Sequence, residues 1–162
     1  MAMNFKPIYS VGSGGTPSAN PYKTAATQTF KVGDMVSLTT AGLVTDASDT
    51  TTGLLGVAAS AATGSAEGDE VLVYDDPGLV YLAASDTASE CLQTLVGAQV
   101  DLNEDQDDGV DTNGSSAVVL TVVDLWSNRS DSASIPSGQT ISDQILVTII
   151  NAKHIFGDFV AP

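Results

Sequence analysis

The chain has few of the side chains that carry covalent or metal chemistry. It contains one cysteine, Cys91, and one histidine, His154. A single cysteine excludes an internal disulfide and a cysteine-rich zinc site. No cation lies beside Cys91 in the sequence to stabilise a thiolate, so an inert buried thiol is favoured over a nucleophile. His154 lies in an apolar tail and is expected to be a partly buried structural residue. These absences predict a protein that is not an enzyme and uses no cofactor.

Positive charge is also scarce. Five lysines and arginines stand against 20 aspartates and glutamates, and the formal net charge is −15. Proteins that bind nucleic acid neutralise phosphates with clustered cations, whereas the cations here are dispersed along the sequence. The composition therefore argues against binding to DNA or RNA and against adhesion to an anionic membrane. It suits a protein kept soluble at high local concentration, or an outward-facing surface component. The five cations are Lys6, Lys23, Lys31, Arg129 and Lys153.

Long apolar runs are missing, and aromatic residues make up only 6% of the chain. No stretch approaches the length of a membrane span, and the first residues lack the apolar region of a signal peptide. We expect synthesis in a cytoplasm and no membrane partner. The small aliphatic residues that dominate the chain favour a thin β-protein over a deep ligand pocket.

What the chain does have is a repeated pattern of a tight turn followed by a short apolar run. Gly and Pro supply the backbone angles of turns, and apolar runs of four to eight residues between them predict strands. A hairpin is expected about Ala41-Gly42, and a second across Asp75-Asp76-Pro77-Gly78. Strands are predicted over residues 35–39, 43–45, 54–58, 71–74, 79–83, 117–126 and 145–151.

The predicted fold is mainly β: a small β-barrel, β-tulip-like or sandwich domain with one short helix and an extended N-terminal arm. The helix is expected from Ala88 to about Thr94, because Thr87 and Glu90 match a capping box. Residues 95–102 could extend this helix, but Gly97 and the alternation around Val100 favour a strand. A polar loop is expected over residues 127–143.

The first 29 residues read as a flexible arm ahead of a β-rich domain over residues 30–162. Gly12-Ser13-Gly14-Gly15 lacks the lysine and helix signal of a phosphate-binding loop and is typical of a linker. Apolar residues flank this linker on both sides. They are either part of a frayed terminus or anchors that order when they dock on a partner. The candidate anchors are Phe5, Pro7, Ile8, Tyr9 and Tyr22.

One acidic stretch, residues 101–111, is the only candidate metal site. Dense carboxylates can hold Ca²⁺, but an EF-hand loop starting at Asn103 would need glycine at position 108 and glutamate at position 114. Those positions are Asp108 and Gly114. A solvated, self-repelling loop is favoured over a metal site. Paired carboxylates for glycoside cleavage stay open, although the chain has few aromatic platforms.

The stretch from Phe30 to Ala84 contains four turn-and-strand patterns: Val32-Gly33-Asp34-x-Val36, Gly53-x-x-Gly56-Val57-Ala58, Gly68-Asp69-x-Val71 and Pro77-Gly78-Leu79-Val80. In these patterns the stretch resembles the bacteriophage capsid cement, or head decoration, proteins. The resemblance covers roughly a third of the chain, and no motif carries over for residues 1–29 or beyond about residue 100.

The resemblance implies a structural virion protein on the outer surface of the phage head. It would bind as a homo-oligomer, a trimer at local three-fold sites, and clamp neighbouring major capsid subunits. The arm residues would then anchor to the capsid or to a neighbouring protomer. The alternative is a carbohydrate- or receptor-binding β-module, such as a head fibre or adhesin domain, which would rely on an exposed aromatic cluster or a Ca²⁺ site in the 101–111 loop.

Overall fold

The prediction of a mainly β protein is confirmed. A computed structural model describes residues 4–11, 16–47, 53–63, 68–87, 91–103, 109–113, 118–129, 144–150 and 154. The strands are β1 (Lys6–Ser10), β2 (Asn20–Lys23), β3 (Thr29–Phe30), β4 (Met35–Leu38), β5 (Val44–Asp46), β6 (Leu54–Ala58), β7 (Ala62–Thr63), β8 (Glu70–Tyr74), β9 (Leu79–Ala84), β10 (Gln99–Leu102), β11 (Val110–Asp111), β12 (Leu120–Leu125) and β13 (Gln144–Ile149).

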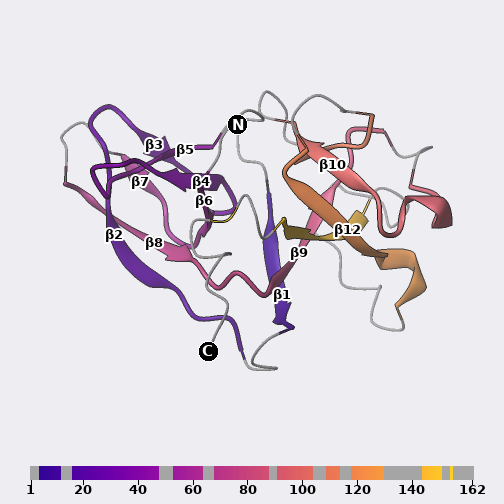
Figure 1. The fold of residues 1–162 in the computed structure, drawn as a ribbon. Coiled ribbons are helices and arrows are strands. Elements are labelled where there is room, and N and C mark those ends of the chain that lie inside the picture. The colour runs from indigo at the N-terminus through magenta and orange to yellow at the C-terminus, as the bar shows by residue number, and fades with distance from the viewer. Residues whose placement is uncertain are drawn as a thin grey trace, which may run out of the picture.

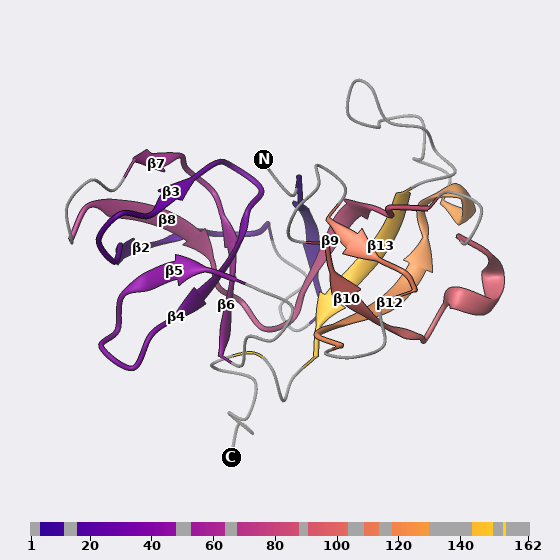
Figure 2. The same cartoon turned by 90° about the horizontal axis from the view of Figure 1, so that it is seen from above.

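The strands form two main sheets that lie side by side, as Figures 1 and 2 show. The six-stranded sheet has the order β1-β9-β13-β12-β10-β11, and the five-stranded sheet has the order β2-β8-β6-β4-β5. A short pair, β3-β7, covers part of the five-stranded sheet. The ladders between named strands are antiparallel, and across the described residues no sheet closes into a barrel.

Most of the predicted strands are present within a few residues of their expected bounds. The hairpin about Ala41-Gly42 joins β4 to β5, and Gly42 has the positive φ of 79° that such a turn requires. The alternation around Val100 becomes β10, as expected. Of the predicted 127–143 loop, residues 130–143 lie outside the described residues.

The predicted hairpin across Asp75–Gly78 is wrong. β8 and β9 do not pair, because β8 belongs to the five-stranded sheet and β9 to the six-stranded sheet. The Pro77-Gly78 turn forms, but it acts as a corner that carries the chain from one sheet to the other. We call residues 75–78 the corner. β9 is buried along its whole length because apolar side chains cover both of its faces, a setting that a two-stranded hairpin does not provide.

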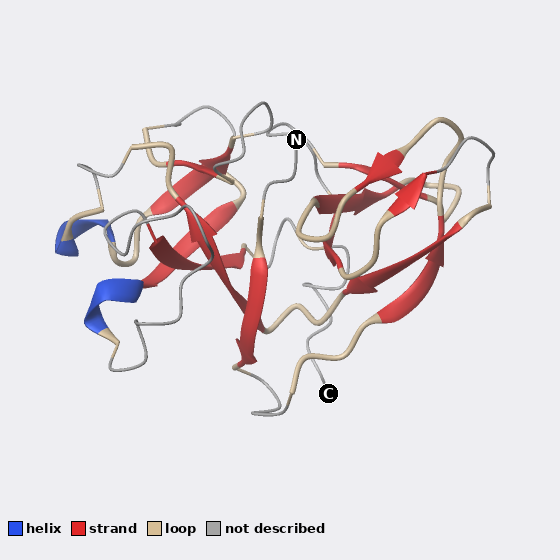
Figure 3. Ribbon diagram, turned by 180° about the vertical axis from the view of Figure 1, so that it is seen from behind, coloured by secondary structure: helices blue, strands red, loops and turns tan. Residues whose placement is uncertain are grey.

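The predicted helix is also shorter than expected. Residues 88–90 lie outside the described residues, and Cys91 and Leu92 are not helical. The helical part of this stretch is one 3₁₀ turn, η2 (Gln93–Leu95). A second 3₁₀ turn, η3 (Trp126–Asn128), follows β12, and both turns are blue in Figure 3. Gly97, with φ of 89°, then turns the chain into β10, so the local capping signal does not extend into a longer helix.

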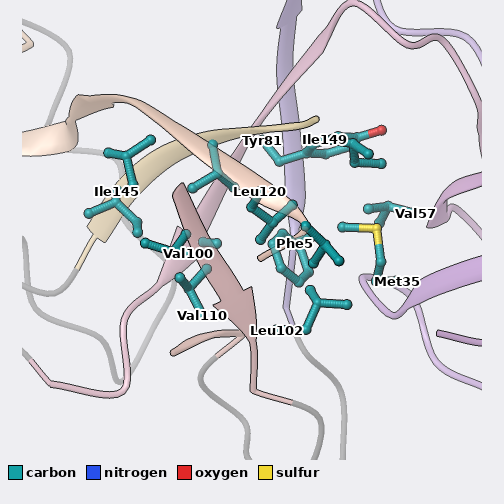
Figure 4. Packing of buried hydrophobic residues seen from close by; sticks show 14 of the residues in the cluster. Phe5, Met35, Val57, Tyr81, Val100, Leu102, Val110, Leu120, Ile145 and Ile149 are labelled. Atoms are coloured by element: carbon teal, nitrogen blue, oxygen red, sulfur yellow. The ribbon is translucent and has the colours of Figure 1, made fainter. Parts of the chain in front are cut away.

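One hydrophobic core joins the two sheets. Met35, Leu54 and Val57 of the five-stranded sheet pack in the same buried cluster as residues of the six-stranded sheet. Figure 4 shows Met35 and Val57 facing Phe5 and Leu120 across this cluster. We call it the shared core. Its members from the six-stranded sheet are Leu79, Tyr81, Ala83, Val100, Leu102, Val110, Leu120, Val122, Leu125, Ile145, Val147 and Ile149.

Gly56 should tolerate no side chain. Its φ is +152°, and a Cβ there would lie 1.9 Å from the carbonyl oxygen of Tyr74. We expect Gly56→Ala to lower the free energy of unfolding by about 3 kcal/mol or more, because backbone must move to admit the methyl group. Gly42→Ala is the matched control: its φ is also positive, but nothing lies within 4 Å of the added Cβ, so it should cost only about 1–2 kcal/mol. Urea denaturation of both variants checks this, and equal losses would contradict it.

Candidate functional site at the N-terminal edge

The N-terminal segment, residues 4–23, forms the edge of both main sheets. β1 pairs with β9 from Lys6↔Leu82 to Ser10↔Leu79, and β2 pairs with β8 from Asn20↔Val73 to Lys23↔Glu70. Because β8 and β9 follow one another in the chain, β1 and β2 lie along them on either side of the corner (Figures 1 and 3). Residues 4–11 and 16–29 of the predicted arm therefore belong to the folded body, and residues 1–3 and 12–15 lie outside the described residues.

Phe5, predicted to anchor on a partner, is instead an internal residue. It is 3% exposed within the shared core, and its ring packs edge-to-face on Tyr81 with centroids 6.3 Å apart. Such aromatic pairs contribute about 0.5–1.5 kcal/mol beyond their burial. In this arrangement Phe5 has almost no surface left for contact with another protein, and its role as an anchor on a capsid or a neighbouring protomer stays a prediction. Phe5 holds β1 to its own chain.

Ile8 and Tyr9 pack on the opposite face of the six-stranded sheet. With Val123 they cover a buried cluster that we call the outer cluster, made of Val80, Leu82, Trp126 and Leu146. The guanidinium of Arg129 lies 5.5 Å from the centroid of the Tyr9 ring and 5.6 Å from that of Trp126. A cation at this distance is attracted to aromatic faces. The single arginine of the chain therefore ties β1 to the turn after β12.

Tyr22 and the corner form a polar joint between the two sheets. The Tyr22 hydroxyl donates a short hydrogen bond to Oδ2 of Asp75, and Asn20 Nδ2 donates to Asp75 Oδ1 at 2.8 Å. Ser10 Oγ donates to Asp76 Oδ2 at 2.7 Å, and the other oxygen of Asp76 accepts the backbone N–H of Gly78 at 2.8 Å. Both strands of the N-terminal segment are thus bound to the corner.

Burial and the neighbouring carboxylate raise the pKa of Tyr22. Partial burial is the larger cause, followed by the hydrogen bond to Asp75 and the negative charge of that carboxylate. The pKa of Tyr81 is raised as well, first by burial and then by the charges of Asp76 and Asp75. Both hydroxyls therefore stay protonated at neutral pH and act as hydrogen-bond donors, Tyr81 to the carbonyl of Tyr74 at 3.2 Å.

Pro7 is half-buried and lines a groove of about 360 Å³ at the start of β1. The groove also contains Lys6, Ala58, Tyr74 and Val32, the last of which is 58% exposed. Gly33 closes one side, where its carbonyl accepts the backbone N–H of Phe5 at 3.0 Å. Apart from Asn4 and Lys6, the side chains that line the groove are apolar or aromatic, so it is suited to contact with a protein surface more than to a charged small ligand.

The cations of the chain lie on or beside the N-terminal segment but not in one cluster. Lys6 is exposed on β1 and Lys23 is exposed on β2. They lie at the two ends of the segment, and Lys23 stands opposite Glu70 in the β2–β8 ladder. Lys31 is exposed in the turn before β4, two residues from the Gly33 whose carbonyl accepts the N–H of Phe5. Arg129 lies against Tyr9, while Lys153 is outside the described residues.

The other candidate residues lie outside the N-terminal segment. Cys91 is partly buried and packs against the shared core. His154 is 4% exposed, forms a parallel bridge with Leu54, and donates its backbone N–H to the carbonyl of Ile150 at 3.1 Å. Burial lowers the pKa of His154, opposed by the charges of Asp75 and Asp76 and by a hydrogen bond to the backbone of Leu55.

The acidic stretch is only partly described, since residues 104–108 lie outside. Asp101 is buried opposite Asp111 in the β10–β11 ladder, and its Oδ1 has no hydrogen-bond partner among the described residues. Within those same residues, no three metal-binding side chains come close enough to hold an ion. No helix in the described stretches combines the length and apolar composition needed to cross a lipid bilayer.

Comparison with known proteins returns no family model and no curated protein that matches this chain.

The joint at Tyr22 predicts a loss of stability in alkali. The folded pKa of Tyr22 lies above the value of about 10 in the unfolded chain. The contribution of Tyr22 to the free energy of unfolding is therefore complete below pH 10. It is lost as the pH rises through the pKa of Tyr22 in the folded state. We expect Tyr22→Phe to cost about 0.5–1.5 kcal/mol at pH 7, the value of one hydrogen bond, and this difference from wild type to shrink above pH 10.

Thermal unfolding from pH 7 to pH 11 measures this effect. Tyr9→Phe is the matched control, since Tyr9 packs on the outer cluster and not on the corner. A difference between Tyr22→Phe and wild type that stays constant over the whole range would show that the hydroxyl of Tyr22 does not support the joint.

Proposed function

We propose that this protein is a structural virion component that binds the outer surface of a bacteriophage head and stabilises it by clamping neighbouring major capsid subunits. The proposal begins with the resemblance of residues 30–84 to the head decoration proteins. The patterns that carry it lie in β4, β6, β8 and β9 and at the corner. These residues form turns and strands and do not position a reactive side chain, which suits a protein that acts by binding.

The distribution of charge is the observation that carries the proposal furthest. In a chain of net charge −15, exposed Lys6, Lys23 and Lys31 lie on or beside the strands of the N-terminal segment. These cations would pair with carboxylates of an acidic partner surface, whereas surface that carries only carboxylates would repel it. We propose that the N-terminal edge faces the capsid and that the acidic remainder faces solvent. The protein would not compete with the shell for packaged DNA.

The structure changes how the predicted anchors would take part. Phe5 supports β1 from inside, Ile8 and Tyr9 are half-buried, and Tyr22 is held by Asp75. The groove beside Pro7 and exposed Val32 then supplies apolar contact area, and the lysines supply charge. Each such contact is weak. A homo-oligomer, as the resemblance implies, would add the contacts of several copies and reach strong retention through multivalency.

Removal of the edge charges should weaken capsid binding. The variant Lys6→Gln/Lys23→Gln/Lys31→Gln loses three exposed cations, each worth about 0.2–1 kcal/mol in an exposed ion pair. We expect its affinity for expanded, undecorated phage heads to fall between about threefold and a hundredfold, with a steeper loss at low salt. Co-sedimentation with such heads measures the bound copies, and the rupture temperature of the heads measures stabilisation.

The matched control adds three negative charges elsewhere. Thr40→Glu/Thr63→Glu/Gln99→Glu alters exposed positions outside the N-terminal segment and shifts the net charge by the same three units. This control should keep most of the binding. Equal loss in both variants would show that total charge, and not the N-terminal edge, controls the contact. Failure of wild type to bind mature heads would contradict the proposed function itself.

The alternative of a carbohydrate- or receptor-binding module has one observation in its favour. Asp101 presents a buried oxygen without a hydrogen-bond partner in the described residues, beside the acidic stretch. A shift of the melting temperature on adding Ca²⁺, or binding to a glycan array, would favour this module. Unchanged melting together with binding to heads would favour the decoration protein.

A further inference from the structure

We infer that the groove beside Pro7 holds one apolar side chain of the capsid surface, from an exposed protein segment in which a carboxylate lies next to that side chain. The inference rests on the proposed function for the source of this segment. The chemistry of the groove can be tested on the isolated protein, so the inference and the proposed function can fail separately.

The groove is ordered without a partner. It lies between the start of β1 and the turn before β4. The backbone N–H of Phe5 donates to the carbonyl of Gly33 at 3.0 Å, and the N–H of Gly33 donates to the carbonyl of Ala58 at 2.9 Å. At Gly33 an added Cβ would lie 3.0 Å from the Cα of Asn4, so these two segments are in close contact. A site that is already ordered loses little conformational entropy when a partner binds.

The size and lining of the groove suit one large apolar side chain. Its volume of about 360 Å³ is at the lower end of the range of about 300–1,000 Å³ found for ligand pockets. That space admits a side chain with a little of its backbone and excludes a whole helix or strand. Pro7, Ala58 and Val32 line it, and the exposed part of Val32 would be removed from water when a partner docks.

The charges beside the groove favour a partner that carries a carboxylate. Among the described residues that line the groove, Lys6 is the one charged residue, and none is an aspartate or glutamate. Exposed Lys31 comes directly before Val32 in the chain. Charges farther away than about 8 Å are largely screened at physiological salt. The lysines beside the groove therefore act more strongly on a bound carboxylate than the distant acidic residues of the chain do.

Val32 is distinguished from the other exposed apolar side chains by this setting. Among the described residues, Val11, Leu72 and Leu92 are exposed as well, but none of them lines the groove. Val32 alone combines exposure with an ordered hollow and a neighbouring cation. A nucleic acid would need more cations than the two lysines here, and a charged small ligand would leave the apolar lining without a partner. The combination therefore selects an acidic protein segment.

Blocked dipeptides test the chemistry of the groove on the full chain. Acetyl-Leu-Asp-amide carries both features, acetyl-Leu-Asn-amide lacks the charge, and acetyl-Ala-Asp-amide lacks most of the apolar side chain. In an NMR titration at about 0.15 M salt, the first probe should shift the amide signals of Lys6, Val32 and Gly33 and leave that of Leu92 in place. We expect it to bind about twofold or more tighter than the Leu-Asn probe and about fivefold or more tighter than the Ala-Asp probe.

Several results of this titration would overturn the inference. Equal affinities for the three probes, or no shift of the groove signals, would do so. Shifts caused by a methyl glucoside and not by the dipeptides would favour the carbohydrate-binding alternative. Tighter probe binding after removal of residues 1–3 would assign the groove to the chain itself. A mass above one copy in light scattering that falls in Val32→Glu would assign it to a second copy.

Binding to expanded, undecorated phage heads tests the source of the segment. Val32→Glu places a carboxylate at the groove, and Leu92→Glu is the matched control, since Leu92 is 60% exposed and Val32 is 58% exposed. Both exposed substitutions should keep the melting temperature of wild type. We expect Val32→Glu to weaken head binding by about tenfold or more, through lost apolar contact and repulsion of the partner carboxylate, and Leu92→Glu to change it by less than about twofold.

The outcomes on heads separate the two proposals. Wild type that binds heads, with equal binding by Val32→Glu and Leu92→Glu, would overturn the inference and leave the proposed function intact. Wild type that binds the Leu-Asp probe but not the heads would contradict the proposed function and, with it, the capsid as the source of the segment.

Discussion

β8 and β9 follow each other in the chain but lie in different sheets, and the rest of the structure depends on the corner that separates them. Asp75 and Asp76 hold this corner through hydrogen bonds from Asn20, Tyr22 and Ser10. β1 and β2 of the N-terminal segment therefore lie beside β9 and β8, and both strands are hydrogen-bonded to the corner between them. The two sheets are held together in this way and share one core. Each sheet alone would be too small to bury its apolar side chains well.

Two glycines of the motifs that resemble the head decoration proteins bring backbone segments together beside the shared core. Gly56 lets β6 approach the backbone at Tyr74, which sits at the end of β8 next to the corner. Gly33 accepts the N–H of Phe5 and donates its own N–H to Ala58 at 2.9 Å. These glycines bring backbone segments close together instead of shaping a pocket for chemistry. The motifs of the chain thus serve the framework, and its candidate contacts are distributed over a surface.

A distributed surface suits the proposed action in many copies. The N-terminal segment carries exposed lysines and lines one side of a groove. Neither feature would give strong binding alone, because exposed charges are screened and small grooves bury little area. In the proposed homo-oligomer, the contacts of several copies would add up.

The sequence by itself determined the local elements. The turn residues at Gly42 and Pro77-Gly78 and the apolar runs between them placed most strands, because turn angles and strand burial depend on neighbouring residues. Only the tertiary structure decided which strands pair. It separated β8 from β9 and placed the described strands of the expected arm, β1 and β2, against both. The physical reason is that pairing depends on which faces become buried together over long sequence separations. A turn such as Asp75–Gly78 can serve a hairpin or a corner equally well, and a Gly-rich linker does not reveal that Phe5 has a site in the shared core.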